Sequence, residues 1–163
     1  MIRRPPRSTQ GVSSAASDVY KRQNFGAILR SAAAFGVDAI FISNTGSAPL
    51  NADVVKTSAG AAFKVPIVKV NHLKDVVYLL KTYKIPCLGI TEKAKETLYW
   101  KDFEGSIAVV FGSEDIGISN GLLKILDDQA KIPMQQSINS LNVSVACGVI
   151  FYEIIRQRGF IKA

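Results

Sequence analysis

A seven-residue turn, FGSEDIG at 111–117, joins two glycines to a carboxylate directly after an apolar run. Gly112 and Gly117 permit a ligand to approach the backbone closely, and Glu114 places negative charge where backbone N–H groups would otherwise attract an anion. That charge argues against a phosphate cradle, and the chain contains neither GxxxxGK[ST] nor GxGxxG. The turn suits a ligand with hydroxyl or positively charged groups, although a glycine-rich turn after a strand is often purely structural.

A second unusual stretch, IPMQQSINSLNVSVACGVIFYE at 132–153, passes from a polar loop directly into an apolar helix. Ser140 or Asn142 either caps this helix or contributes a polar group to a site, and the residue types leave both interpretations open. One face of the helix is apolar, which is typical of a core or of an oligomer interface. The residues of that face are Val145, Val149, Tyr152 and Ile155.

A third stretch, NFGAILR at 24–30, begins a helical pattern. Asn24 can cap the helix, and we expect Gly26 in its first turn, where the missing side chain admits something bulky. Arg30 follows in an otherwise apolar helix. It either extends to solvent along its methylene stem or binds an anion or a carboxylate.

Helical and strand-like patterns alternate from Asn24 onward, which predicts an α/β fold with a mostly parallel sheet flanked by helices. The expected helices are 24–36, 53–63 with a close-packed turn at Gly60, 73–84, 120–126 and 141–157. The expected strands are 39–43, 66–70, 86–91, 107–111 and 130–132. Parallel sheets bind ligands beyond the carboxyl ends of their strands, so the site is expected after the last three of these strands.

Residues 1–23 differ from the rest of the chain in composition and charge. They carry five basic side chains and one acidic side chain, and therefore +4 of the net charge of +7. A basic arm for RNA phosphates is one interpretation. The segment SSAASDVYKRQ instead resembles translated adaptor or vector sequence, which favours a foreign, disordered leader at 1–23 that plays no part in the fold.

The remaining composition excludes several classes of protein. Cys87 and Cys147 lack the spacing of a zinc site or a redox pair, and they are expected to be small buried apolar residues in a reducing cytoplasm. No apolar run approaches the roughly 20 residues of a membrane span. His72 is expected only to precede a helix. Tyr99 and Trp100 either stack on RNA or pack internally.

NxGxxxR at 24–30, FGSExxG at 111–117 and IPMxxxxxSLNVSVA at 132–146, in this order, resemble the SpoU/TrmH family of RNA ribose 2′-O-methyltransferases. The likeness covers about 24–158. The stretch SAPLNADVVKTSAGAAFKVPI and the ending YEIIRQR are most similar to the branch that methylates guanosine in 23S rRNA.

The resemblance implies a SPOUT-type fold whose C-terminal segment is threaded into a trefoil knot. It also implies S-adenosylmethionine as cofactor, RNA as partner with rRNA favoured over tRNA, a homodimer, a cytoplasmic location, and neither a metal nor a membrane. The residues it places at the cofactor are Thr91, Gly112, Ile132, Met134 and Leu141. The residues it places around the reacting ribose, as catalytic groups, are Asn24, Arg30, Glu114, Ser140 and Asn142.

The implied reaction is in-line attack of a ribose 2′-hydroxyl on a sulfonium methyl, which needs alignment of the reacting atoms and management of one proton. In this family the arginine of the first motif is often proposed as the base. A guanidinium pKa above about 12 makes that role difficult. We expect Arg30 to hold the neighbouring phosphate and to stabilise developing alkoxide charge, with Asn24 orienting it.

Three features depart from the family pattern. Asp115 and Gln136 stand where glycine is usual, which adds side chains next to the expected cofactor loops. The family also has a strand and an Asp-Pro turn before Asn24, where this chain has its unusual leader. We therefore expect 24–163 to be a truncated catalytic domain whose first, central strand is missing or replaced. The alternative is a non-catalytic RNA-binding or dimerisation module, or an inactive fragment.

Overall fold

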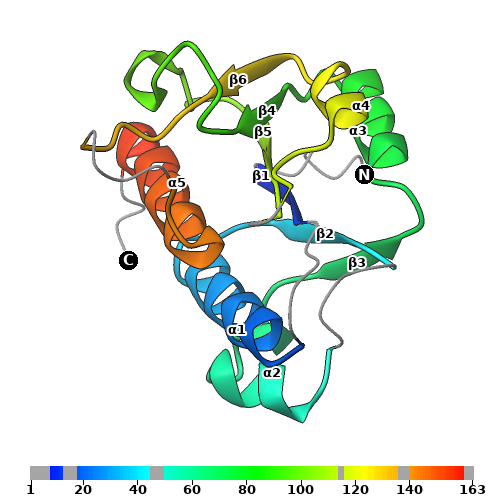
Figure 1. Cartoon of the computed structure of the whole chain (residues 1–163). Helices are drawn as coiled ribbons and strands as arrows, with labels where there is room; N and C mark the ends of the chain where they lie inside the picture. Colours follow the sequence, from blue (N-terminus) through cyan, green and yellow to red (C-terminus); the bar gives the residue numbers. More distant parts are fainter. Residues whose placement is uncertain (1–7, 13–17, 45–49, 114–115, 136–139, 160–163) are drawn as a thin grey trace.

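The computed structural model is a single six-stranded sheet with helices on both faces (Figure 1). It describes residues 8–12, 18–44, 50–113, 116–135 and 140–159, with side chains from Arg22 onward. The strands are β1 (Ser8–Val12), β2 (Ala39–Ser43), β3 (Ile67–Val70), β4 (Cys87–Ile90), β5 (Ile107–Phe111) and β6 (Asp128–Ala130). They lie in the order β3-β2-β1-β5-β4-β6, and every pair of neighbours is parallel. The helical elements are α1 (Asp18–Ala34), α2 (Ala52–Thr57), η1 (Ala61–Phe63), α3 (Leu73–Thr82), η2 (Leu98–Trp100), α4 (Asn120–Leu123) and α5 (Val143–Arg158).

Strand β5 shows why this sheet is buried on both faces. All five of its residues are buried, and successive side chains of a strand point to opposite faces. Ile107, Val109 and Phe111 join the core cluster beneath α1 and α5, whereas Ala108 and Val110 join the cluster beneath α3 and α4. The continuous apolar run in the sequence therefore reflects a central strand between two helical layers.

Residues 1–23 were expected to play no part in the fold, and their described part contradicts this. Ser8–Val12 forms β1, in the place where a central strand was expected to be missing or replaced. It pairs in parallel with β2 on one side, where Gln10 is opposite Ile40, and with β5 on the other, where Gln10 is opposite Val109. Backbone groups between two buried strands need hydrogen-bond partners, and extended backbone supplies them whatever its side chains are. Composition therefore did not reveal this strand.

The first long helix also begins earlier than expected. Helix α1 starts at Asp18, so Asn24 lies inside the helix and does not cap it. Gly26 is likewise outside the first turn. A Cβ on Gly26 would come within 2.6 Å of the Cβ of Thr57, so the glycine is required for close packing of α1 against α2 and not for admitting a ligand.

Elsewhere the expected elements are present with shifted ends, except that the helix expected at 53–63 is divided into α2 and η1. Gly60 between them has a φ of 78° and is not closely packed, since a Cβ there would meet nothing within 4 Å. The strands at 39–43 and 107–111 have the predicted bounds. The last strand was expected at 130–132 and instead spans Asp128–Ala130, because Asp128 and Gln129 are polar residues of an edge strand and escape a search for apolar runs. The predicted 120–126 helix ends at Leu123, and the 141–157 helix begins at Val143 because Asn142 caps it.

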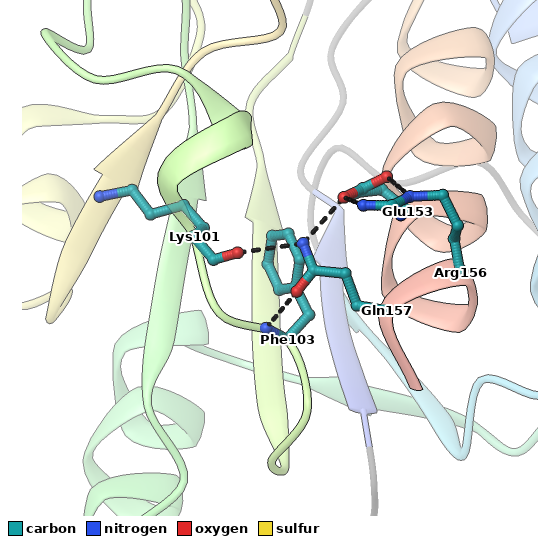
Figure 2. A network of polar contacts seen from close by, with 5 residues as sticks. All are labelled: Lys101, Phe103, Glu153, Arg156 and Gln157. Atoms are coloured by element: carbon teal, nitrogen blue, oxygen red, sulfur yellow. Dashed lines mark hydrogen bonds and ion pairs between the residues drawn. The ribbon is translucent and has the colours of Figure 1, made fainter. Parts of the chain in front are cut away.

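The C-terminal end of α5 is fastened to the segment that precedes β5 (Figure 2). The Nε2 of Gln157 donates to the carbonyl oxygen of Lys101 over 3.0 Å, and its Oε1 accepts from the backbone N–H of Phe103 over 2.9 Å. Glu153 accepts hydrogen bonds from both Gln157 and Arg156. The Arg156 hydrogen bonds, aided by Gln157 and opposed by partial burial, hold the pKa of Glu153 below its usual range. The network fixes the far end of the helix whose other end borders the site.

Both cysteines are buried, as expected, with exposed fractions of 1% for Cys87 and 0% for Cys147, and they are not joined in a disulfide. Burial, assisted by nearby Asp127 and opposed by Lys81, raises the pKa of the Cys87 thiol to about 11. His72 directly precedes α3, as expected. Among the described helices, none is both long and apolar enough to cross a membrane.

Candidate active site

A cavity of about 620 Å³ lies beyond the carboxyl ends of β4 and β5 and against the start of α5. Cavities of this volume hold small organic ligands, and this end of a parallel sheet is where such ligands bind. Its lining residues come from three segments far apart in sequence: Ile90, Thr91, Glu92 and Lys93; Phe111, Gly112, Ser113, Ile116, Gly117 and Ile118; and Ile132, Met134, Ser140, Leu141, Asn142, Val143 and Ala146.

All five residues expected at a cofactor border this one cavity, namely Thr91, Gly112, Ile132, Met134 and Leu141. Thr91 follows β4 and is buried, and its backbone N–H donates to the carbonyl oxygen of Ala130 over 3.0 Å. That hydrogen bond joins the ends of β4 and β6. The fold thus brings the residues that were predicted for the cofactor together at one cavity.

Gly112 sits at a point where a side chain does not fit. A Cβ there would overlap the backbone of Gly117 and Ile118, because the turn folds back on itself. Ser113 and Gly117 exchange backbone hydrogen bonds of 3.2 and 2.8 Å, and Gly117 has a φ of 71°, in the region that favours glycine. The two glycines of the FGSEDIG motif are therefore required by the turn itself.

Asn142 is both a helix cap and a bridge to α1. Its Oδ1 accepts hydrogen bonds from the backbone N–H and the hydroxyl of Ser144, over 2.8 and 2.6 Å. Its Nδ2 donates to the Oδ1 of Asn24 over 3.0 Å. The interpretation of Asn142 as a cap is confirmed, and the same side chain links the first and third motifs at the wall of the cavity.

The other residues expected around the ribose are less closely gathered. Ser140 is exposed and borders the cavity, whereas Glu114, Asp115 and Gln136 lie outside the described residues. Arg30 is exposed, is absent from the cavity lining, and forms no ion pair or hydrogen bond with another described residue. Six helical positions separate it from Asn24, which corresponds to about 9 Å along the axis and about 120° around it. Asn24 is bonded to Asn142, so no contact in the structure supports the expectation that it orients Arg30.

Apart from Thr91, four lining residues lie outside the motifs that the sequence singles out: Ile90, Glu92, Lys93 and Ile118. Glu92 and Lys93 directly follow the segment ending at Thr91, so the rule that ligands bind beyond strand ends already pointed to them. Among the described residues, no group of three or more His, Cys, Asp or Glu side chains could hold a metal ion.

An exposed apolar stripe runs along α5 next to α1. Val145, Val149 and Tyr152 have exposed fractions of 51%, 38% and 47%, so these three residues of the expected apolar face are not core in the single chain. The Tyr152 ring meets the ring of Phe35 edge to face, with centroids 6.2 Å apart. Figure 1 shows the two helices side by side.

Comparison with known proteins agrees with this geometry. The SpoU rRNA Methylase family matches residues 14–152, a range that contains all three motifs and every segment of the cavity. The chain belongs to this family. Two curated SpoU relatives are 23S rRNA (guanosine-2′-O-)-methyltransferases RlmB. The protein of Vibrio cholerae is 42% identical over 135 residues, and that of Escherichia coli K12 is 40% identical over 135 residues. These alignments cover 83% of this chain but 55% and 56% of the relatives, so the chain spans about half of their length.

Solved SpoU structures have the same fold. The methyltransferase AviRb of Streptomyces viridochromogenes, solved in complex with AdoMet, is 26% identical and superposes with a TM-score of 0.84 over 97% of this chain and 60% of its own. An RNA 2′-O ribose methyltransferase is 29% identical and superposes with a TM-score of 0.81, again over 97% of this chain. The α/β fold with a parallel sheet flanked by helices is therefore confirmed.

Proposed function

We propose that this SpoU chain transfers a methyl group from S-adenosylmethionine (AdoMet) to a ribose 2′-hydroxyl of RNA, at a guanosine of the large-subunit rRNA. One observation carries the proposal: the second and third motifs of the family border one cavity at the carboxyl ends of β4 and β5, and Asn24 of the first motif accepts a hydrogen bond from Asn142 at the wall of that cavity. The RlmB relatives, at 40–42% identity, support a guanosine of 23S rRNA as the target.

The residues around the cavity fit AdoMet. Ile90, Phe111, Ile118, Ile132 and Leu141 offer apolar surface for a purine ring, and the loops after β4 and β5 offer backbone groups for polar atoms. Gly112 belongs to this lining, and its missing side chain permits the tight turn that forms part of the cavity wall. When bound, AdoMet supplies a methyl group on a positively charged sulfur, and the neutral sulfide that leaves requires no acid.

The chain's own task is then to position the ribose and to accept the hydroxyl proton. Ser140 is exposed at the cavity wall, where its hydroxyl can accept a hydrogen bond from the ribose. Asn142 is a positioning residue, because its Oδ1 and Nδ2 are engaged with Ser144 and Asn24 and hold the start of α5 in place. Glu114 remains a candidate for the ribose site from its motif alone.

Arg30 acts in this proposal as a phosphate ligand. Its guanidinium stays charged at any physiological pH, which makes it a poor base and a good bidentate partner for a phosphate. Its exposed position outside the cavity lining fits contact with the RNA backbone next to the reacting nucleotide. It then stabilises negative charge that develops on the ribose oxygen.

We further propose that the chain works as a homodimer in the cytoplasm, and that its C-terminal segment forms a trefoil knot. The stripe of Val145, Val149 and Tyr152 supports the dimer, because an apolar face of this kind is normally covered by another surface. The knot is supported by Ile132, Met134 and Leu141, which line the same cavity as the residues that follow β4 and β5.

Isothermal titration with AdoMet, followed by mapping of ribose methylation on total RNA, tests the function. We expect micromolar binding and a new 2′-O-methyl group on a guanosine of large-subunit rRNA. Absence of heat together with an unchanged melting temperature in the presence of AdoMet would favour the non-catalytic module instead.

A further inference from the structure

Two neighbouring aromatic side chains are almost fully exposed on the short helix η2. Tyr99 is 73% exposed and Trp100 is 82% exposed, whereas Leu98 beside them is only 4% exposed. A 3₁₀ helix has three residues per turn, so when one residue faces the core the next two face solvent. The expectation that these aromatic residues pack internally is therefore wrong for the single chain.

The backbone under these rings is firmly held. The segment lies along the end of the edge strand β6, where the N–H of Leu98 donates to the carbonyl oxygen of Lys131 and the N–H of Lys131 donates to that of Glu96, both over 3.0 Å. The Lys101 side chain, 9% exposed, reaches Glu96 at 2.5 Å and Asp128 at 2.6 Å. The two aromatic rings are thus presented on an ordered support, which lowers the entropy lost when a partner binds.

Lysines and carboxylates both lie close to this aromatic pair in sequence, with Glu92, Asp102 and Glu104 among the carboxylates. Lys93, Lys95 and Lys131 belong to the same segment or to the strand end beside it, and none of them forms an ion pair with a described residue. The carboxylates of Glu96 and Asp128 are already bound to Lys101. Free ammonium groups beside exposed aromatic rings are the combination that binds single-stranded nucleic acid, because rings stack on bases and cations contact phosphates.

The aromatic pair also belongs to the segment that leaves the cavity. Glu92 and Lys93 line the cavity, and Tyr99 follows Lys93 by six residues. The cavity and η2 are therefore joined by one short segment, and nucleotides that flank the one at the cavity are the candidates for contact with η2.

We propose that Tyr99 and Trp100 form a stacking platform for unpaired bases of the RNA substrate, separate from the cavity where methyl transfer occurs. This inference rests on the proposed function, since it assigns a second contact to the same RNA. A second copy of the chain is the other possible occupant. The apolar stripe of Val145, Val149 and Tyr152 on α5 suits a second copy better than the two aromatic rings in the charged segment of η2 do.

Trp100 is the single tryptophan of the chain, so its fluorescence reports the platform directly. Titration of the full chain with a single-stranded 12-nucleotide oligoadenylate should quench the emission, and the half-saturation concentration should rise with salt. With a fluorescein-labelled oligonucleotide, Trp100→Ala should weaken binding about tenfold, and Trp100→Phe should restore most of the affinity. Phe63→Ala is the matched control, because Phe63 is an 81% exposed aromatic on η1.

Unchanged affinity of Trp100→Ala for the oligonucleotide, at an unchanged melting temperature, would overturn the platform. Emission that changes with protein concentration and not with RNA would overturn it too, because a second copy would then cover Trp100. AdoMet titration and methyl transfer are measured separately. If RNA quenches Trp100 but no methyl group is transferred, the platform is supported and the proposed function is contradicted. If methyl transfer occurs and Trp100 is not quenched, the proposed function is supported and the platform is contradicted.

Discussion

Asn142 Nδ2 donates a hydrogen bond of 3.0 Å to Asn24 Oδ1, across 118 residues of sequence. The bond ties the cap of α5 to the middle of α1 and lies at the wall of the cavity. Two asparagines that looked like separate helix caps are therefore one connection between the first and third motifs.

Replacing either asparagine should remove the hydrogen bond between α5 and α1 and lower the stability of the protein. Asn142→Ala removes a cap and the bridge, and it should lower the free energy of unfolding by about 1–2 kcal/mol. Asn24→Ala should cost less, and the double variant should cost less than the sum of the two, as measured by urea denaturation.

Asn51→Ala is the matched control for Asn142→Ala. Asn51 caps α2 by accepting from the N–H of Val54 over 3.2 Å, so this variant loses a cap away from the cavity. We expect AdoMet affinity to fall in Asn142→Ala and to stay unchanged in Asn51→Ala. Equal affinities in the two variants would contradict the bridging role.

Gly112→Ala should abolish AdoMet binding and destabilise the protein, because the added methyl overlaps the backbone of Gly117 and Ile118. Gly105→Ala is the control, since a Cβ at Gly105 meets nothing within 4 Å. Calorimetric titration and thermal unfolding of both variants check this. A Gly112→Ala protein that binds AdoMet normally would show that the turn opens easily.

Gln10→Pro tests whether the leader belongs to the fold. Gln10 lies in β1 between β2 and β5, so proline there removes a ladder N–H in the middle of the sheet and should cost about 3 kcal/mol or more. Gln10→Val, which keeps the N–H, should fold normally. If both variants melted at the same temperature, the strand Ser8–Val12 would be dispensable for the fold.

Arg30→Lys separates phosphate binding from proton abstraction. Lysine keeps the charge and loses the bidentate geometry, so the main effect should be on RNA binding, with an increase of about tenfold in Kd or KM. Fluorescence anisotropy and single-turnover methylation measure the two effects. An intact Kd with activity lost at every pH would contradict the role of Arg30 as a phosphate ligand.

Acid should weaken the contact that holds the segment carrying η2. Burial alone would raise the pKa of Asp128, but the Lys101 hydrogen bond and the Gln129 N–H lower it overall. Burial alone would lower the pKa of Lys101, and its two carboxylate partners raise it overall.

A carboxyl whose pKa is lower in the folded state stabilises the protein above its unfolded pKa of about 3.9 and loses that contribution as pH falls through the folded value. We therefore expect the free energies of unfolding of wild type and Asp128→Asn, measured by urea denaturation, to differ more at pH 6 than at pH 3. A difference that does not change with pH would mean that the ion pair contributes no pH-dependent stability.

The sequence alone determined the family, the layer architecture and the motif residues that line the candidate site. The strand at 107–111 was predictable because burial on both faces leaves a continuous apolar run, and Gly112, Ile132 and Leu141 were predictable because they stand in ordered motifs. The local surroundings of these positions require their residue types, so the types and their spacing can be recognised in the sequence.

Only the tertiary structure decided the remaining points. Ser8–Val12 became a central strand because β2 and β5 need a backbone partner between them, and a backbone requirement leaves little trace in side chains. Position 26 requires glycine because of its contact with Thr57 on α2. The side chain of Asn24 is held by its hydrogen bond to Asn142. The members of each pair are distant in sequence, so they interact only after the sheet and the two long helices have packed together.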